Sequence, residues 1–228
     1  MKIKTLLALF PSIFFCLRYL PLKQAIKLPI IIYKPKFHCL DGKVIINSRK
    51  ISFGMIRIGL FITNLYPNTG INWYNKGTIV FKGKACIGAN SFITVLRENS
   101  YLEFGDNFGN SSTLRINCDY RIILQDNVLI GFDVVILDSS LHRLKNSEGK
   151  FIGKGYDEVY LGNGTWIASN CIIMQGVKTP DFSVFGAHSL LNKDYAKYHG
   201  FSLFAGSPAK FIKEGVWRDP KDNKITID

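Results

Sequence analysis

Apolar residues recur at every sixth position over three stretches of this chain, with short polar segments between them. The residues that follow this spacing are Phe81, Ile87 and Ile93, then Leu124, Ile130 and Ile136, and then Leu161, Ile167 and Ile173. A helix repeats about every 3.6 residues and a strand every 2, so neither element alone produces a period of six. A chain that points one side chain inward from a short strand, turns and repeats does produce it, and such hexapeptide periodicity is typical of a parallel β-helix. We therefore predict an all-β fold in which every sixth side chain enters one core.

The same spacing divides the chain into an N-terminal segment, a repeat region and a tail. We call each run of apolar residues at this sixfold spacing a ladder. Residues 1–36 lack a ladder and have a helical pattern that prolines should interrupt. These prolines are Pro11, Pro21 and Pro29. Residues 37–193 carry the ladder as a β-helix domain, except for residues 138–157, which are rich in Ser, Lys and Gly and indicate an inserted loop. Residues 194–228 form a polar, aromatic-rich tail that we expect to cap the last coil, because the open end of a solenoid would expose its core.

The composition favours one sizeable core without a disulfide framework. The chain has 228 residues, of which 47% are hydrophobic, enough to bury a core of one large domain. Its five cysteines are odd in number and include no C-x-x-C pair, so we expect neither disulfides nor a zinc site, and a reducing compartment. His38, His188 and His199 have no metal-ligand spacing and are interpreted as structural residues, so we expect no metal.

The formal net charge of +12 indicates an anionic partner. A membrane surface, a phosphorylated cofactor or a nucleic acid would each satisfy this balance. The basic residues cluster in residues 1–50, where only Asp41 opposes them, and no nucleic-acid-binding motif accompanies them. We therefore expect no nucleic-acid partner, and a membrane or a phosphorylated cofactor instead.

The apolar run at residues 6–17 is too short to span a bilayer, which needs about 20 apolar residues. It has the general shape of a signal peptide, but no small-residue cleavage site follows it. Two interpretations stay open. Residues 1–30 either lie on a membrane surface as an amphipathic segment or pack against one end of the core. In the first case one apolar side would contain Leu6, Leu9, Phe10, Ile13, Phe14 and Leu17.

Three ordered motifs in the C-terminal third resemble those of one enzyme family. They are LGNGTWIASN at residues 161–170, VFGAHSLLNKD at residues 184–194 and AGSPAKFIK at residues 205–213. These segments are similar to the coils and closing segment of the left-handed β-helix, hexapeptide-repeat acyltransferases, especially the sugar and polysaccharide O-acetyltransferases. The resemblance covers about residues 81–213. It implies a left-handed parallel β-helix with an N-terminal helical segment, an inserted catalytic loop and a C-terminal tail.

The resemblance also implies a catalytic base in the inserted loop. The segment ILDSSLH, which ends at His142, is similar to the loop that carries the general-base histidine of the family. A sugar hydroxyl is a poor nucleophile unless its proton is removed during attack, and a neutral imidazole has a pKa suited to that step. His142 would take the proton while the oxygen attacks the acetyl group of acetyl-CoA, without an acyl-enzyme. Asp138 would orient His142 or bind substrate.

The family's cofactor site is matched by residues of the last coils and the closing segment. These residues are Trp166, Ser169, Ala187, Asn192, Lys193, Lys210 and Lys213. The resemblance implies that the backbone at Ser169 and Ala187 contacts the pantetheine arm of CoA, and that the lysines meet its phosphates, where cations are required. Asn117 and Asp119 are weaker candidates for substrate-hydroxyl ligands, for which a turn role is the favoured alternative.

Together these features predict an acetyl-CoA-dependent O-acetyltransferase acting on a sugar hydroxyl, in a cell-surface polysaccharide or its lipid-linked precursor. An N-acetyltransferase of an amino sugar or nucleotide sugar is the alternative, because the same base and donor serve an amine. A non-catalytic carbohydrate-binding scaffold is disfavoured by His142 and the donor-site motifs. The family resemblance further implies a homotrimer. We expect a cytoplasmic location, with a peripheral contact at the inner face of the membrane if residues 1–30 bind lipid.

Overall fold

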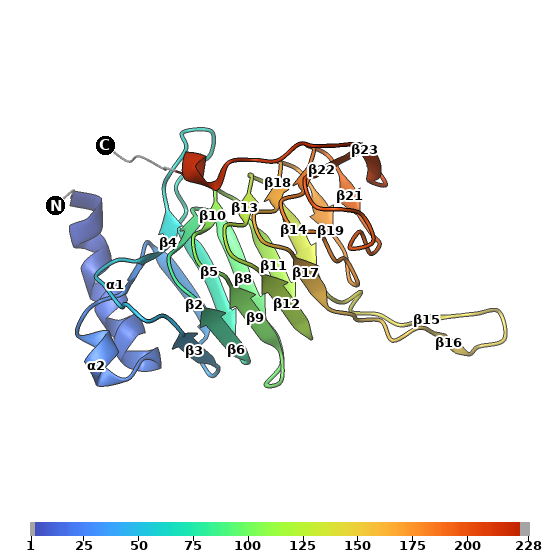
Figure 1. The fold of residues 1–228 in the computed structure, drawn as a ribbon. Coiled ribbons are helices and arrows are strands. Elements are labelled where there is room, and N and C mark those ends of the chain that lie inside the picture. The colour runs from blue at the N-terminus through green and yellow to red at the C-terminus, as the bar shows by residue number, and fades with distance from the viewer. Residues whose placement is uncertain (1–2, 224–228) are drawn as a thin grey trace.

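The chain forms a three-sided prism of short parallel strands, with two helices at one end and a hairpin that projects from its side (Figure 1). This computed structural model describes residues 3–223. Each turn of the chain up to residue 161 adds one strand to each side of the prism, and the later turns add none to one side. We name the sides sheets A, B and C. The parallel β-helix predicted from the sixfold spacing is confirmed.

The strands of each sheet pair with those of the coils before and after. Sheet A contains β1 (Ile30–Ile32), β4 (Ile56–Leu60), β7 (Ala85–Gly88), β10 (Phe108–Asn110), β13 (Leu129–Ile130), β18 (Trp166–Ile167), β20 (Val184–Phe185), β22 (Ser202–Ala205) and β23 (Lys210–Glu214). Sheet B contains β2 (Pro35–Cys39), β5 (Ile71–Asn75), β8 (Ser91–Val95), β11 (Arg115–Cys118), β14 (Val135–Leu137), β19 (Ile172–Ile173) and β21 (Leu190–Leu191). Sheet C contains β3 (Lys43–Ile46), β6 (Thr78–Phe81), β9 (Tyr101–Phe104), β12 (Arg121–Leu124) and β17 (Val159–Leu161).

The predicted ladders are the core of the prism. Their nine residues are all fully buried. The ladder that begins at Leu124 and the one that begins at Leu161 lie in register on successive coils, and their residues pair on sheets C, A and B as Leu124–Leu161, Ile130–Ile167 and Ile136–Ile173. Burying each such side chain contributes about 1.5–3 kcal/mol. The sixfold period therefore places one inward side chain on each face of the prism in every coil.

Asn110 occupies a ladder position in the coil before Leu124, although it is polar and fully buried. Its Oδ1 accepts the Gly88 N–H at 3.2 Å, and its Nδ2 donates to the Gly131 carbonyl at 2.9 Å. A buried amide is tolerated when both of its ends are hydrogen-bonded. Asn110 thus links three successive coils of sheet A through one side chain.

Helices α1 (Ile3–Tyr19) and α2 (Leu22–Ala25) close the N-terminal end of the prism. The prediction that Pro11 interrupts the helix is wrong, because α1 continues through it. Ser12, the next residue, stabilises the helix at this point. Its hydroxyl donates to the Ala8 carbonyl of α1 and accepts the N–H of Ile32 in sheet A at 2.9 Å. Strand β1 begins before the boundary predicted at residue 36, so the prism starts earlier than the ladder indicated.

One face of α1 packs on the first coils and the other faces outward. Phe15 is fully buried, with its ring edge-on to Trp73 at 5.1 Å and stacked on Phe37 at 5.8 Å. The interpretation that the segment packs against the end of the core is therefore correct for this face. The outward face exposes Phe10, Ile13, Phe14 and Leu17. Within residues 3–223, no helix combines the length and apolarity needed to cross a bilayer.

The tail extends sheet A at the opposite end. Strand β22 pairs in parallel with β20, and β23 turns back to pair with β22 in antiparallel register. Phe204 stacks on Phe185 at 4.8 Å, and Tyr195 packs edge-on to both rings at 5.2 Å. These buried rings cover the last coil, and the closing 3₁₀ helix (Pro220–Asn223) follows them.

We call α1 and α2 together the cap. Two phenylalanines of α1 give a matched test of how the cap packs on the prism. Replacing Phe15 by alanine should lower the free energy of unfolding by about 3–5 kcal/mol, because a buried ring leaves a cavity between Trp73 and Phe37. Replacing Phe10, which is 83% exposed, should change it by no more than about 0.5 kcal/mol. Chemical denaturation of the two variants measures both values. Equal stability of the Phe15→Ala and Phe10→Ala proteins would contradict the packing.

Candidate active site

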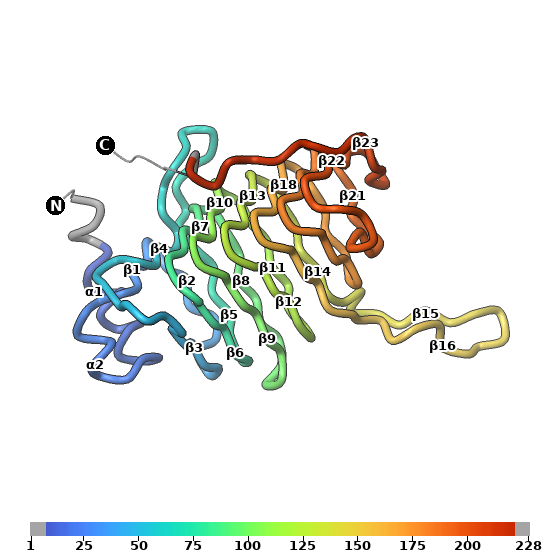
Figure 2. The backbone as a smooth tube through the Cα atoms, viewed as in Figure 1, coloured from blue at the N-terminus to red at the C-terminus, as the bar shows by residue number. Residues whose placement is uncertain are grey.

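The inserted loop is a hairpin that leaves the prism between sheets B and C (Figure 2). We call the turns that join a strand of sheet B to the next strand of sheet C the B–C corner. The hairpin replaces one of these turns, between β14 and β17, and its strands β15 (Leu144–Lys145) and β16 (Phe151–Ile152) pair antiparallel. At its base, the N–H of Asp157 donates to the Asp138 carbonyl at 2.9 Å, and Ser139 pairs with Tyr156. Its outer part is solvent-exposed and adds no side chain to the core.

Asp138 anchors this hairpin to the preceding coil. Its side chain is fully buried, and its carboxylate accepts the backbone N–H groups of Asp119 at 2.8 Å and Tyr120 at 2.9 Å. Burial raises the pKa of the carboxyl group, and these hydrogen bonds oppose that rise. In the described part of the chain, no hydrogen bond joins Asp138 to His142. Asp138 therefore fixes the base of the hairpin, and its role in orienting His142 or binding substrate stays a prediction.

An open hollow of about 720 Å³ lies between the hairpin and the B–C corner, and we call it the catalytic hollow. The hairpin contributes Ser139, Leu141, His142, Arg143, Lys154, Gly155 and Tyr156, and the neighbouring corners contribute Arg97, Glu98, Asn99, Asp119 and Tyr120. The backbone at His142 is held by the Ser140 hydroxyl, which donates to the His142 carbonyl at 2.6 Å. The imidazole is exposed, so a substrate in the hollow has direct access to it.

Charged and aromatic pairs shape the rest of the hollow. The Arg97 guanidinium donates twice to the Asp119 carboxylate, at 2.5 and 3.1 Å. These hydrogen bonds raise the pKa of Arg97. The rings of Tyr120 and Tyr156 lie 5.0 Å apart and connect the corner to the hairpin. Such a combination of planar polar groups and aromatic faces suits the hydroxyls and apolar faces of a sugar.

The structure separates the two residues predicted as substrate ligands. Asp119 lines the catalytic hollow, whereas Asn117 lies half-buried in β11 and is not among the residues that line it. Sequence reasoning missed Arg97, Tyr120 and Tyr156. Their proximity depends on coil length, because Arg97 meets Asp119 only when the intervening coil returns the chain to the same corner. Arg143, Lys154 and Tyr156 all lie in the inserted loop, so their place in the loop was the signal by which the sequence could have identified them.

The residues predicted to bind CoA lie on the last coils and the closing strand, and they occupy three different surfaces of the prism. Ser169 and Ala187 occupy successive turns between sheets A and B, where the Ser169 carbonyl accepts the N–H of His188 at 3.0 Å. Trp166 and Lys213 align across sheet A through Val184 and Leu203, and Lys210 lies on the same strand as Lys213. Asn192 and Lys193 follow β21 at the B–C corner. The small exposed Ala187 and the exposed lysines of β23 suit an elongated ligand that carries phosphates.

Cys118 and Cys171 have no environment that would activate a thiol. Burial raises the pKa of the Cys118 and Cys171 thiols, which therefore stay protonated at neutral pH. Within residues 3–223, no group of three or more His, Cys, Asp or Glu side chains is arranged to hold a metal ion. Among the exposed titratable residues that line the catalytic hollow, His142 carries the imidazole that the sequence predicted as a base.

Comparisons with known proteins place these features in a family. No family model matches the chain. The chain is 30% identical over 150 residues to the galactoside O-acetyltransferase of Escherichia coli (strain K12), an alignment that covers 62% of this chain and 71% of the relative. It is also 44% identical over 54 residues to a chloramphenicol acetyltransferase of Morganella morganii, which covers 24% of each chain.

A solved structure shares the fold. The polySia-specific acetyltransferase NeuO superposes with a TM-score of 0.52 at 20% identity, over 82% of this chain and 89% of that one. This likeness shows the left-handed β-helix architecture, and the sequence relationship to the galactoside enzyme shows the family. The chain therefore belongs to the hexapeptide-repeat acetyltransferases, and it is an acyltransferase.

Proposed function

We propose that this protein transfers an acetyl group from acetyl-CoA to a hydroxyl of a sugar, with His142 as the general base. The observation that carries the proposal is the position of His142 in the catalytic hollow, beside an ion pair and two tyrosines that suit a sugar. A sugar hydroxyl in this hollow would transfer its proton to the imidazole as its oxygen attacks the thioester carbonyl. The C–S bond then breaks, the CoA thiolate leaves, and the imidazolium returns its proton to that thiolate, which gives free CoA thiol and neutral His142.

The donor site is proposed on the last coils. Acetyl-CoA supplies the activated acetyl group. Ala187 and Ser169 would receive the pantetheine arm through their backbone groups, and Trp166 would cover it from sheet A. Lys193, Lys210 and Lys213 would meet the phosphates and the adenine end, together with Asn192.

Substitution of His142 tests the proposed base. His142→Ala should lower kcat by about 10²–10⁴, the usual contribution of general acid–base catalysis. Folding should be unaffected, because the side chain lies outside the core. The measurement is thiol release from acetyl-CoA with a panel of neutral, acidic and amino sugars. His199→Ala is the matched control, since His199 is also exposed but lies away from the hollow. Turnover of the His142 variant within a few-fold of wild type would remove His142 from the mechanism, and a preference for amino sugars would indicate N-acetylation.

We propose further that the active unit is a homotrimer with sites shared between subunits. The hairpin projects away from its own prism, while the donor residues lie on the last coils. A site between chains would bring the hairpin of one to the coils of the next. Light scattering should give a trimer mass for the purified protein.

A mixing experiment tests whether the site is shared. His142→Ala removes the base, and Ala187→Trp should block the pantetheine arm without disturbing the fold, because Ala187 is exposed. If the base and the donor site come from different chains, co-expression of the two inactive variants should restore activity. The mixture should then exceed the sum of the separate variants. Mixed assemblies with no recovered activity would show that each chain contains a complete site.

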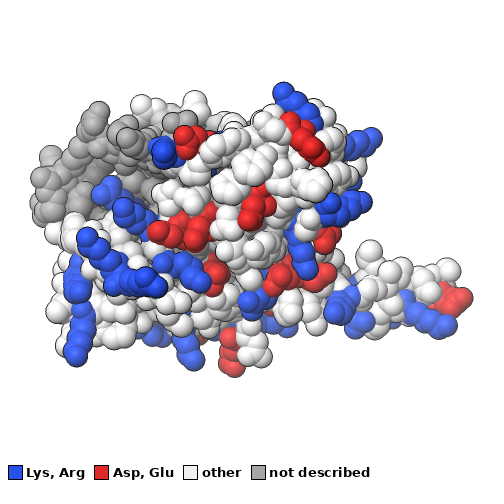
Figure 3. All heavy atoms as spheres, viewed as in Figure 1, with Lys and Arg blue, Asp and Glu red and all other residues white. Residues whose placement is uncertain are grey.

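The same segment that caps the prism is proposed to touch the inner face of a membrane, with the enzyme in the cytoplasm where acetyl-CoA is available. Its outward face exposes Phe10, Ile13, Phe14 and Leu17, at spacings of three and four on α1, and Leu22 and Ile26 beyond it. Of the other residues predicted on this side, Leu9 is half-buried, and the side chain of Leu6 lies outside the described residues. Arg18, Lys23 and Lys27 are exposed nearby, and Figure 3 shows basic side chains gathered at this end. Each cation near an anionic surface contributes about 1 kcal/mol.

Vesicle binding by full-length protein tests this contact. Wild-type protein should co-sediment with phosphatidylcholine vesicles that contain phosphatidylserine, and far less with phosphatidylcholine alone. Phe10→Gln with Leu17→Gln, or Lys23→Gln with Lys27→Gln, should weaken binding at least about tenfold, because each pair removes part of the apolar or electrostatic attraction. Phe53→Gln with Leu65→Gln is the control, since these exposed apolar residues lie outside the cap. Failure of wild-type protein to bind the anionic vesicles would end the proposal.

A further inference from the structure

Three hollows follow one another from the cap to His142, and the second and third lie at the B–C corner. The first, the cap hollow, has about 300 Å³ and lies between the cap and β3. The second, the corner hollow, has about 500 Å³ and includes Lys43, Lys76, Glu98 and Asn99. Lys43 lines both the cap and corner hollows, and Glu98 and Asn99 line both the corner and catalytic hollows. Neighbouring hollows therefore adjoin at shared residues.

Strand register sets the length of this path. Lys43 on β3 pairs with Thr78 on β6, and Thr78 with Tyr101 on β9; β12 and β17 follow in the same sheet (Figure 1). Neighbouring strands lie about 4.8 Å apart, so the four steps from β3 to the coil that follows the hairpin span about 19 Å. A single sugar in the catalytic hollow would leave most of this path empty, whereas an extended acceptor would follow it.

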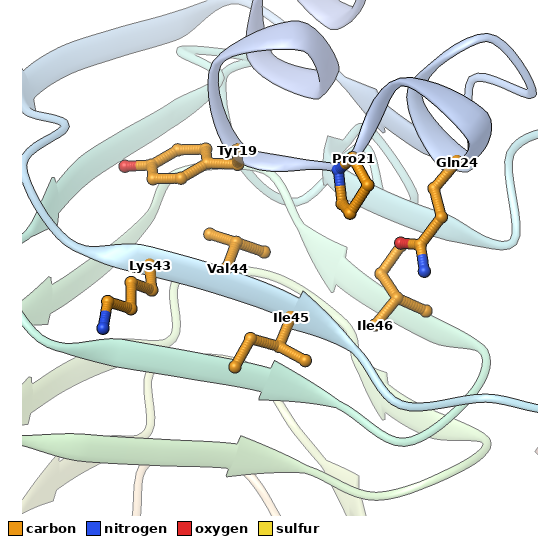
Figure 4. A pocket seen from close by; sticks show the side chains of 7 residues that line it. All are labelled: Tyr19, Pro21, Gln24, Lys43, Val44, Ile45 and Ile46. Carbon is orange, nitrogen blue, oxygen red and sulfur yellow. The ribbon is translucent and has the colours of Figure 1, made fainter.

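The character of the path changes from apolar to polar. Figure 4 shows Tyr19, Pro21 and Gln24 of the cap facing β3 across the cap hollow, which Val44, Ile45 and Ile46 line from the strand. Ile45 is 45% exposed there although it is aliphatic. The corner hollow instead contains Asp41, Glu98 and Asn99, which offer hydrogen bonds to hydroxyls. An apolar group fits the cap end, and a saccharide fits the rest.

Two lysines mark the junction between these parts. Lys43 lies where the cap and corner hollows meet, and Lys76 lines the corner hollow in the next coil. Both are exposed, and neither forms a salt bridge with another described residue. The Lys76 ammonium lies 5.8 Å from the centre of the Tyr74 ring, and Asp41 and Glu98 line the same hollow, so a phosphate would have to lie on the lysine side of it. A phosphate that links a lipid to a sugar would lie at this junction, where ammonium groups recognise it as point charges.

We propose that the three hollows form one track for a lipid-linked glycan, with the lipid at the cap, its phosphate at Lys43 and Lys76, and its sugar units extending to His142. The track rests on the proposed acetyl transfer and names its acceptor class. It also gives the cap's exposed apolar face a purpose, because Leu22 and Ile26 lie on the same short segment as Pro21 and Gln24. A membrane-embedded lipid would enter the track from that side.

The kinetic test compares one saccharide as a free sugar and as its octyl phosphodiester, below the concentration at which the amphiphile forms micelles. Without micelles or vesicles, membrane attachment does not contribute. Wild-type kcat/KM should be at least about tenfold higher for the phosphodiester. Lys43→Gln with Lys76→Gln should lower the ratio of the two kcat/KM values by about tenfold or more, the effect expected for lost charge-assisted hydrogen bonds. Ile45→Asn should lower it by a smaller factor. Lys36→Gln with Lys84→Gln is the control, since these exposed lysines line none of the hollows.

Equilibrium binding separates failure of the track from failure of the proposed function. The octyl phosphodiester should bind His142→Ala protein by calorimetry, and at least about tenfold more weakly when Lys43 and Lys76 are also replaced. Binding of this kind in a protein that acetylates no sugar would support the track and contradict the proposed reaction. Active enzyme with equal kcat/KM for both acceptors would overturn the track. So would equal losses on both acceptors, or binding unaffected by the lysine substitutions.

Discussion

The stacking of coils in register is the constraint on which the rest of the structure depends. Each short strand satisfies its backbone groups only through the coils on either side, and each ladder residue contacts its counterparts above and below, as Ile130 does with Ile167. A stack of this kind has two open ends, and both need a cover. The N-terminal end is covered by Phe15 and its helix, and the C-terminal end by Tyr195 and Phe204.

The hollow that contains His142 comes from an interruption of the regular stack at one corner. The hairpin is this interruption. The Asp138 carboxylate connects it to the stack by accepting the backbone N–H groups of the previous corner. Burial of that carboxyl group disfavours its charged form, which the two N–H donors offset in part. Asp138 thus fixes the start of the hairpin that carries His142. Replacing this side chain should shift the hairpin as well as destabilise the fold.

The features that could be predicted from the sequence are those that repeat. The ladders, the interrupting loop and His142 within it are visible because apolar spacing and local motifs need no knowledge of distant contacts. Asn110 was missed because a polar residue in a ladder position is acceptable only through partners on two other coils. The Arg97–Asp119 pair was missed because coil lengths differ along the chain, so corner partners have no fixed spacing. The predicted break of the helix at Pro11 was wrong because a tertiary contact between Ser12 and β1 stabilises α1 next to this proline.

The net positive charge alone does not identify the anionic partner, whereas the positions of the basic residues in the fold indicate what each group could bind. A net charge of +12 was equally compatible with a membrane and with a phosphorylated ligand. In the fold the cations are divided: Arg18, Lys23 and Lys27 surround the exposed apolar face of the cap, Lys43 and Lys76 lie where an apolar hollow becomes polar, and Lys210 and Lys213 lie on the last strand. Each group faces a different chemical setting along one prism. A membrane surface, a lipid phosphate and a nucleotide-bearing CoA would each meet one of these groups, and in the proposed trimer the CoA would face the hairpin of the neighbouring subunit.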